Sequence, residues 1–379
     1  MGIKRIALIG YALDEYKDNT DLYSEDMGFY VAKRARENAG VAREDITSVH
    51  NSTMDLFDGI TISNGILIPA AGGYNRDSVR IQNGCLFAII SAYASIMSGA
   101  TEIAVVSSAD AVDYDHFVVA NISTDPFFDQ PVGKNHLNSY ALFSDMYMKK
   151  KKISEEDVVM VASQDYKAGS ENPYAQIREG YTAKQIVNAP MLSFPLRKYE
   201  VVSARSYGGA AIILTSEERA KEYTDSPIWI TGFGMGTNPT SLENMVDMPA
   251  LRYACDEAYE RAGIRDARKE LAVAEINDPF AFFNLAAYEA LQFCDDGGAV
   301  ELLRDGLTSL EGEIPVNVSG GTLCTNAPNS GGLFRTVQAA MYLEKNTKKG
   351  ANKALVHDSD MSIGLAGDSH AVLILEKEA

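Results

Sequence analysis

The sequence predicts an α/β protein that is built from two similar halves. Residues 35–41 (ARENAGV) and residues 258–264 (AYERAGI) share one pattern, a helix end that is closed by glycine. A strand-like apolar run precedes each helix, at residues 3–10 and at residues 227–234. Such a repeat indicates two copies of one strand–helix arrangement, and the alternative is chance similarity between two common amphipathic helices.

The other elements continue the α/β order. Residues 81–84 form a polar turn that leads into the mostly apolar run Leu86–Met97, which predicts a buried helix with Cys85 in its first turn. A strand is expected at residues 209–214, and the chain closes on another at residues 371–375.

One segment interrupts this order. Residues from about 113 to 189 lack the regular strands and carry four consecutive lysines at 149–152, so we expect an inserted loop domain. The lysines are either a solvated helix face or contacts for the phosphates of an anionic ligand. We place the two halves at residues 1–222, which include the insertion, and residues 223–379.

Composition limits the partners. The chain has 379 residues, 46% of them hydrophobic, which is enough for two domains with a large core. Its 52 acidic and 34 basic residues give a formal charge of −18, which disfavours nucleic acid and anionic membranes as partners. The first ten residues read as a strand and not as a secretion signal, and no apolar run is long enough to span a membrane. We expect a cytoplasmic protein.

Cys85 is the residue that most suggests chemistry. The unpaired N–H groups and the positive dipole end of a helix N-terminus favour thiolate over thiol, which makes a nucleophile. The alternative is a small buried apolar residue, as most free cysteines are. Because the other cysteines, Cys255, Cys294 and Cys324, show no CxxC spacing, we expect reduced thiols and no metal site.

Several motifs together resemble those of the thiolase superfamily, and the likeness covers essentially the whole chain. Cys85 stands where thiolases carry their acylated cysteine, at the start of a buried helix. Four further segments resemble family motifs in the family's order: residues 172–175 (NPYA, family NPxA), 206–211 (SYGGAA, family SDGAAA), 275–280 (EINDPF, family NEAF or HDAF) and 315–321 (PVNVSGG, family NPxGG). Residues 287–294 (AYEALQFC) resemble a helix of the sterol-carrier-protein-type and archaeal branch.

The resemblance implies a thiolase fold. This fold has two βαβαβαββ halves in a five-layered αβαβα arrangement, with a loop domain inserted in the first half. It agrees with the repeat found from the residues alone. A homo-oligomer with a homodimer core is also implied.

Two departures concern proton transfer. The family's G-H-P falls on residues 326–328, so Ala327 stands in place of the histidine that activates the nucleophile. The family's C-x-G falls on residues 362–364, so Ser362 replaces a second, acid/base cysteine. A serine hydroxyl has too high a pKa to replace a thiol in this role. The losses indicate either an inactive subunit or a reaction that needs less proton transfer.

Other positions keep the family's residues. By resemblance, Asn277 matches the asparagine that holds the water of one oxyanion hole, and the backbone N–H groups of Gly364 and Cys85 would form the second hole. Asn326 is expected as a neutral donor to the same oxyanion or, alternatively, as a loop-turn asparagine.

Three more residues have two interpretations each. Cys324 either substitutes for the missing second thiol or is a buried strand residue. His357 and His370 lie near the C-terminal loop, where each either reaches the site or has a structural role.

The resemblance implies a thiolase that cleaves a 3-oxoacyl-CoA through an acyl-Cys85 intermediate, with coenzyme A as co-substrate and no covalently bound cofactor. We expect Arg205, Ser206 and Ser362 against the substrate, Arg205 as the partner of a carboxylate. The branch suggests a small zinc-ribbon and OB-fold partner protein. The specific hypothesis is the thiolase-like subunit of a benzoylsuccinyl-CoA thiolase, which releases benzoyl-CoA and succinyl-CoA in anaerobic toluene degradation.

Two alternatives remain on the sequence. A condensing enzyme of the ketosynthase type shares the fold and the cysteine but normally needs two histidines or a histidine and an asparagine. A structural or regulatory thiolase-like subunit is supported by Ala327 and Ser362.

Overall fold

The computed structural model describes residues 5–111, 121, 124–202, 205–238, 245–346, 348, 350–360 and 369–378. The expectations placed on Ser362 and Gly364 lie outside these described residues.

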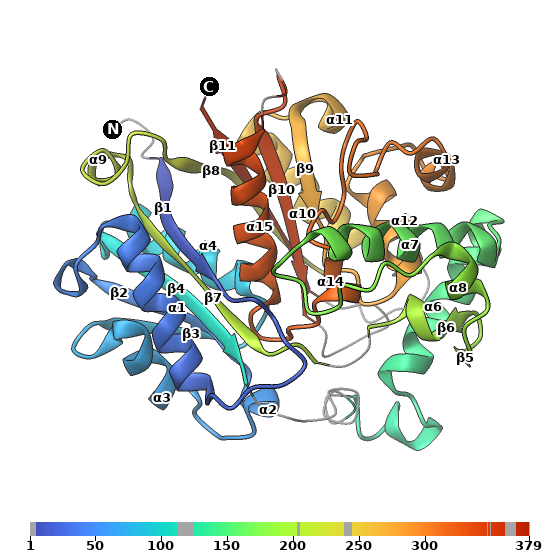
Figure 1. Cartoon of the computed structure of the whole chain (residues 1–379), viewed down its shortest axis with the longest axis horizontal. Coiled ribbons are helices and arrows are strands. Elements are labelled where there is room, and N and C mark those ends of the chain that lie inside the picture. The colour runs from blue at the N-terminus through green and yellow to red at the C-terminus, as the bar shows by residue number, and fades with distance from the viewer. Residues whose placement is uncertain are drawn as a thin grey trace.

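Within the described ranges, nine strands hydrogen-bond in the order β3-β2-β4-β7-β1-β8-β11-β10-β9 (Figure 1). They divide into two halves, β3-β2-β4-β7-β1 and β8-β11-β10-β9, which meet where β1 pairs with β8 over only a few residues. The strands are β1 (Ile6–Leu13), β2 (Ser48–Ser52), β3 (Asp77–Ile81), β4 (Ile103–Asp110), β7 (Gly208–Ser216), β8 (Ile228–Thr237), β9 (Leu271–Glu275), β10 (Lys353–Ser359) and β11 (Ser369–Lys377), and β5 (Met191–Ser193) pairs separately with β6 (Leu196–Arg197).

Four helices complete the layers. Helix α1 (Ser24–Ala39) packs on the outer side of β1, β4 and β7, and α10 (Pro249–Ala262) packs on the outer side of β8 and β11. Helices α4 (Cys85–Met97) and α15 (Gly331–Lys345) lie between the two halves, where their apolar residues share one core with strands of both (Figure 1). The predicted five-layered α/β fold is therefore confirmed.

The remaining helices lie in the insertion and in the connections. The chain leaves the sheet after β4 and returns with β7, and the intervening helices pack against α12 and α14 of the second half. The boundary predicted after residue 222 falls between β7 and β8. These helices are α2 (Asp55–Asp58), α3 (Asn64–Ile68), α6 (His136–Lys151), α7 (Glu155–Glu171), α8 (Ala183–Val187), α9 (Glu217–Ala220), α11 (Ala267–Glu270), α12 (Ala281–Ala290), α13 (Ala299–Arg304) and α14 (Gly321–Cys324).

The repeated helix ends have the same local geometry. Gly40 after α1 and Gly263 after α10 both have a φ of 68°, the left-handed conformation that glycine adopts at least cost. Each glycine N–H donates to carbonyls of the last helical turn. The structure confirms both glycine-ended helices.

The second half lacks one full strand among the described residues. Val316 makes only an isolated parallel bridge with Ala274, at the place where the first half has β3. Pro315 has no N–H to donate, and Asn317 has a φ of 52°, so the chain leaves extended geometry at once.

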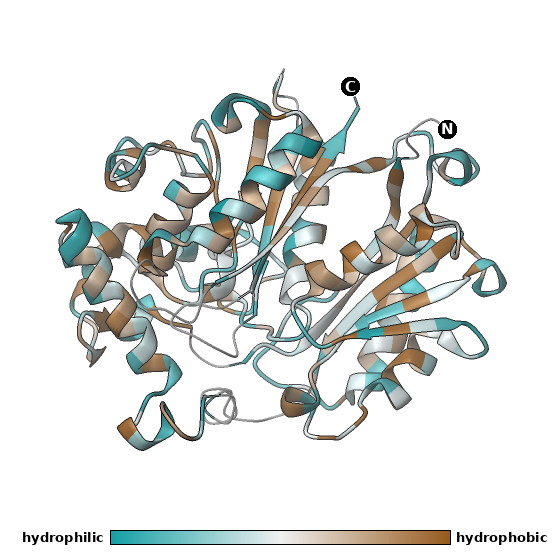
Figure 2. Cartoon of the chain, turned by 180° about the vertical axis from the view of Figure 1, so that it is seen from behind, coloured by the Kyte–Doolittle hydropathy of each residue, from teal (hydrophilic) through white to brown (hydrophobic). Residues whose placement is uncertain are grey.

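Apolar residues concentrate on the strands and on the faces of helices that meet them (Figure 2). Among the residues that the structure describes, none of the helices has the length and apolar character needed to cross a membrane.

Helix α10 packs directly on the backbone of β8. Alternate strand residues face one side of a sheet, and on this side β8 presents Gly232, Gly234 and Gly236. A β-carbon on any of them would overlap a backbone carbonyl oxygen of α10. Glycine is required here by the close approach of the helix.

We expect Gly234→Ala to lower the free energy of unfolding by about 1–3 kcal/mol, because the added methyl group forces α10 away from β8. The matched control is Gly28→Ala in α1, where no heavy atom lies within 4 Å of the new β-carbon. Because glycine is a poor helix residue, this control should raise the free energy by about 0.5–1 kcal/mol. Urea denaturation of both variants measures the difference, and equal stability would contradict the packing.

Candidate active site

Cys85 lies where the N-termini of two buried helices meet. It is the first residue of α4, it is fully buried, and its thiol donates to the carbonyl oxygen of Asn329 at 2.8 Å. Asn329 precedes the start of α15 by two residues. The sulfur therefore lies in the central layer, between the two halves of the sheet.

A buried ion pair holds the chain that leads into α15. The backbone N–H groups of Asn329 and Ser330 donate to the Asp110 carboxylate at 3.1 and 2.9 Å. Arg205 Nη2 donates to the same carboxylate at 2.8 Å, and both side chains are at most 2% exposed. The placement of Arg205 differs from the expected one against a substrate carboxylate, because Asp110, buried at the end of β4, requires a cation beside it.

The structure brings Ser206 and Asn326 together. Ser206 donates its backbone N–H to the carbonyl oxygen of Asn326 at 2.7 Å, and its hydroxyl donates to Gln176. Both residues are at least 98% buried. Ser206, shortly before β7, thus holds the backbone of Asn326. The next residue, Ala327, packs in the same apolar core as Cys85.

The Asn277 side chain is held from two directions. Its Nδ2 donates to the Ser359 hydroxyl at 2.9 Å, at the end of β10, and its Oδ1 accepts from the Thr322 hydroxyl at 2.8 Å, on α14. Asn277 is 2% exposed. The amide is therefore oriented by partners on two different elements, β10 and α14.

Asp358 is a functional residue that sequence reasoning missed. Its carboxylate accepts from the Leu86 backbone N–H at 3.4 Å and from Arg335 Nη2 at 2.5 Å. It therefore lies at the first turn of α4, beside Cys85, although it is 272 residues away from Leu86 in the chain. The only signal in the sequence was an acidic residue two positions after the apolar run 354–356.

The protonation of Cys85 differs from the expectation. Burial, followed by the negative charge of Asp358, raises the pKa of the Cys85 thiol to about 12. The structure contradicts the expected lowered pKa at this helix N-terminus, because burial and, after it, the Asp358 carboxylate both disfavour the thiolate. Cys85 rests as a neutral thiol.

The two histidines near the C-terminal loop bond to each other. His357 Nε2 and His370 Nδ1 are 3.1 Å apart, on the paired strands β10 and β11, and both rings are fully buried. Burial lowers the pKa of His357 well below its usual value, so this ring stays neutral. The arrangement favours the structural interpretation of this pair.

Cys324 faces the inserted domain. Its thiol donates to the carbonyl oxygen of Asp165 on α7, at 3.5 Å, and burial raises its pKa well above the usual range. Asn284 lies nearby and donates to the carboxylates of Asp165 and Asp278 at 3.2 and 3.1 Å. Cys324 is buried, as expected, but the expected strand is wrong, because the residue ends helix α14.

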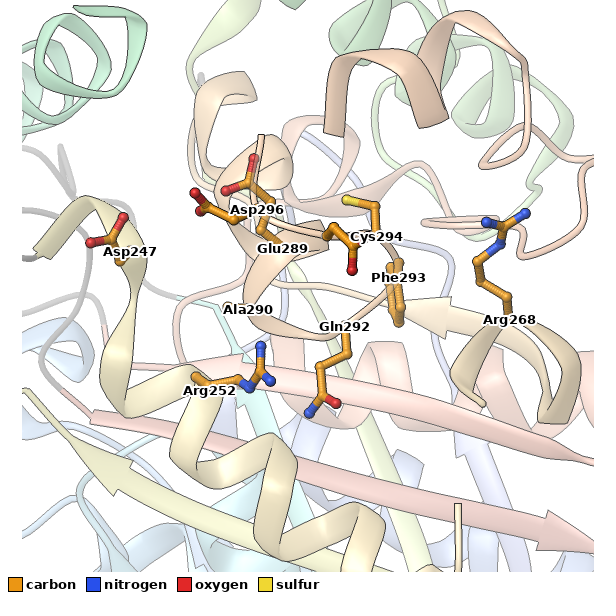
Figure 3. Close-up of a pocket in the computed structure, with 10 residues that line it drawn as sticks. Asp247, Arg252, Arg268, Glu289, Ala290, Gln292, Phe293, Cys294 and Asp296 are labelled. Atoms are coloured by element: carbon orange, nitrogen blue, oxygen red, sulfur yellow. The ribbon is translucent and has the colours of Figure 1, made fainter. Parts of the chain in front are cut away.

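A large surface pocket lies on the outer side of the second half. It has a volume of about 570 Å³, and Figure 3 shows Glu289 and Asp296 close together on one wall, with Arg252 and Gln292 beside each other lower down. Lys151 pairs with Glu289 at 2.7 Å and also with Asp296. Cys85 does not line this pocket.

Three lysines of the run at residues 149–152 form ion pairs with acidic side chains. Lys149 pairs with Asp145 at 2.7 Å, Lys150 with Asp247 at 2.5 Å, and Lys151 with the carboxylates of the pocket. These acidic partners disfavour a phosphate site, and the solvated helix face fits Lys149 and Lys150 but not Lys151, whose side chain is 5% exposed.

The comparisons with known proteins are consistent with this geometry. A family model described as "Thiolase C-terminal domain-like" matches residues 235–377. The acetyl-CoA acetyltransferase of Methanothermobacter thermautotrophicus is 25% identical over 99% of this chain and 100% of that protein. The benzoylsuccinyl-CoA thiolase subunit BbsB of Thauera aromatica is 24% identical over 50% of this chain and 49% of that protein.

A further relative and two solved structures add to these matches. The 17-hydroxy-3-oxo-4-pregnene-20-carboxyl-CoA lyase of Mycobacterium tuberculosis is 26% identical over 48% of this chain and 49% of that protein. A structure named Ltp2-ChsH2(DUF35) aldolase matches with a TM-score of 0.82 and 21% identity over 98% of this chain and 97% of that one. Human mitochondrial 3-ketoacyl-CoA thiolase matches with a TM-score of 0.69 and 17% identity over 100% of both chains.

We expect Cys85 to react slowly with iodoacetamide near neutral pH, at least about tenfold more slowly than in the unfolded chain, because only the thiolate reacts. Since its pKa is raised, the rate should climb steadily from about pH 6 to about pH 10 without a plateau. Cys294, the one cysteine that is not fully buried, should be labelled first. Peptide mass mapping follows both residues, and a plateau for Cys85 near pH 7 would contradict the raised pKa.

Arg205→Met should lower the free energy of unfolding by about 3–5 kcal/mol, because it leaves the Asp110 carboxylate buried without its cation. The control is Arg219→Met, which breaks an exposed pair with Glu102 and should cost less than about 1 kcal/mol. Urea denaturation measures both values. A small effect at Arg205, together with a loss of substrate affinity alone, would restore the expected substrate contact.

Proposed function

Because this chain belongs to the thiolase superfamily, we propose that it is a coenzyme A-dependent acyltransferase that cleaves a 3-oxoacyl-CoA through an acyl-Cys85 intermediate. The observation that carries this proposal is the position of Cys85, at the meeting of the α4 and α15 N-termini in the central layer. Two archaeal relatives named acetyl-CoA acetyltransferase support it, one of them over nearly the whole chain.

The proposed reaction has two halves. The Cys85 sulfur attacks the keto carbon, and the bond between the α and β carbons breaks as the thioester enolate leaves. The thiol of coenzyme A then takes the acyl group from Cys85. The thiol proton of Cys85 ends on the enolate carbon, and the proton of coenzyme A returns to Cys85.

Developing negative charge needs hydrogen-bond donors. We assign this role to Asn277, to Asn326 and to the backbone N–H groups of Cys85 and Gly364, each donor being worth roughly 3 kcal/mol in sites of this kind. Asn277 supports the assignment because its amide is already oriented by Ser359 and Thr322. Ser206 acts by positioning Asn326 through its backbone N–H.

The proposed partners are acyl-CoA, coenzyme A, a second copy of the chain and a small zinc-ribbon and OB-fold subunit. Strand β3 is an edge strand, and the exposed apolar side chains of Ile62, Tyr74 and Val79 lie on it or shortly before it, which supports pairing between two copies. The solved neighbour named Ltp2-ChsH2(DUF35) carries two component names, which supports the extra subunit. Free thiols at all four cysteines fit the cytoplasm.

Benzoylsuccinyl-CoA is the specific substrate that we propose to test. Its support is the relative BbsB of Thauera aromatica, which matches half of this chain. Arg205 no longer supports a dicarboxylic substrate, since Asp110 already occupies its guanidinium group.

A second candidate is carbon–carbon bond cleavage without an acyl-cysteine, and the similarity to a Mycobacterium tuberculosis protein that is named as a lyase supports a function outside acyl transfer. The raised pKa of Cys85 favours it, as does the presence of Ala327 in place of a histidine. A structural subunit is supported by the same two observations. Neither of these functions needs the Cys85 sulfur.

The test is the intact mass of the protein after mixing with 3-oxoacyl-CoA compounds, including benzoylsuccinyl-CoA, without free coenzyme A. We expect an added acyl mass on the wild type and on the control Cys294→Ala, and none on Cys85→Ala. Coenzyme A should remove the added mass. Substrate cleavage that survives in Cys85→Ala would establish the lyase class, and no reaction with the partner subunit present would establish the structural one.

A further inference from the structure

We propose that Asp358, held by Arg335, exchanges the proton with Cys85 and so replaces the histidine that this chain lacks. This role rests on the proposed acyl transfer at Cys85. It follows from the contact geometry of the first turns of α4 and α15.

The Asp358 carboxylate and Cys85 are near neighbours. A β-carbon added to Gly332 would lie 2.9 Å from Cys85 Cβ and 2.8 Å from the carboxyl carbon of Asp358, so a single methyl group would span the gap between them. The carboxylate also accepts from the N–H of Leu86, the residue that follows the cysteine. Asp358 and the Cys85 side chain thus flank the same small space, beside Gly332.

Two glycines make room for this carboxylate. A β-carbon on Gly84, as on Gly332, would overlap the Asp358 side chain. Gly84 has a φ of −54°, which any residue can adopt, and Gly332 lies inside a helix. Glycine is therefore required at both positions by the carboxylate and not by the backbone.

The surrounding charges leave Asp358 as the carboxylate that acts on the thiol. Arg335 donates to it at 2.5 Å and also donates to the carbonyl oxygen of His357, whose own ring is neutral. Among the described residues, Asp110 is the other acidic group near the sulfur, and its two oxygens already accept from Arg205, from the backbone N–H groups of Asn329 and Ser330 and from the Ser330 hydroxyl. On the far side of Asn329, Asp58 accepts from the asparagine amide at 2.8 Å.

Burial raises the proton affinity of both groups. It raises the pKa of Asp358 against the opposing effect of Arg335, and it raises the pKa of Cys85. In the resting state the proton is on sulfur, where it is held by the Asn329 carbonyl oxygen. The carboxylate charge is held by Arg335.

The proton steps balance without any further reagent. As the sulfur–carbon bond forms, the thiol proton moves to Asp358, and the carbon–carbon bond breaks to leave an enolate. Asp358 returns this proton to the enolate carbon. It then takes the proton of coenzyme A as that thiol attacks the acyl-cysteine, and it passes the proton to the released Cys85 sulfur.

The experiment uses Asp358→Asn, which keeps the shape of the side chain and removes its charge and basicity. Two rates are measured: acyl-Cys85 formation in a single turnover, followed by intact mass, and alkylation of Cys85 by iodoacetamide at about pH 8. Acyl formation should slow by about 10²–10⁴-fold, the range for a lost general base. Alkylation should become about 3–10-fold faster, because the thiolate is no longer repelled.

Opposite changes in the two rates are the signature of the proposed role, since a folding defect moves neither rate in this pattern. Asp358→Glu, which retains a carboxylate, should recover part of the acyl transfer and its pH profile. The control Asp247→Asn removes an exposed charge near the remote pocket and should change neither rate. Circular dichroism confirms that each variant is folded.

The outcomes separate the two proposals. A wild type that acylates, with Asp358→Asn acylating at the same rate, overturns the role of Asp358 and leaves the thiolase function intact. A wild type that never acylates overturns the thiolase function. In that case the alkylation rate still decides whether Asp358 acts on Cys85, and an unchanged rate overturns this inference as well.

Discussion

The exclusion of water from the layer between the two sheets determines most of what this molecule can do. Helices α4 and α15 are buried on nearly all sides because strands of both halves pack against them. A charge placed there loses its hydration, so every ionisable group needs a specific partner. Cys85, Asp110 and Asp358 all lie in this buried region. The chemistry of the site follows from the partner that each of them has.

Two ion pairs satisfy that demand. Arg205 pairs with Asp110 and Arg335 pairs with Asp358, and all four side chains are at least 95% buried. Each pair also binds backbone N–H groups at the start of a helix, Asp110 at α15 and Asp358 at α4. The ion pairs therefore set the position of both helix N-termini, and with them the position of the cysteine. A histidine is not needed to hold this arrangement.

The site shows how a familiar scaffold can change its proton chemistry. In a five-layered fold the central helices present a thiol from one half and a loop from the other, and that framework is retained here. The residue beside the loop is Ala327, which has joined the apolar core. A carboxylate from β10 has taken the neighbouring position instead, with two glycines that admit it. The group beside the thiol is thus a carboxylate that is paired with Arg335, and not an imidazole.

The fold could be inferred far more completely than the site. Strand and helix patterns, the glycine-ended helices and the apolar run after Cys85 are local features, because each depends on residues only a few positions apart. They predicted β1, β7, β8, β11 and α4 to within a few residues, and the C-terminal ends of α1 and α10. The motif resemblance supplied the layer order. It could not show that the strand at Val316 is reduced to a single bridge, since that depends on pairing with a distant segment.

The sequence by itself determined the α/β class, the two-half plan and the helix that begins at Cys85, because short-range periodicity and turn chemistry encode them. Only the tertiary structure decided the electrostatics of that cysteine. Arg205 binds Asp110 and not a ligand, and Asp358 reaches the start of α4 from 272 residues away. The physical reason is that a pKa depends on burial and on charges a few ångströms distant in space, and neither quantity is carried by neighbours in the chain.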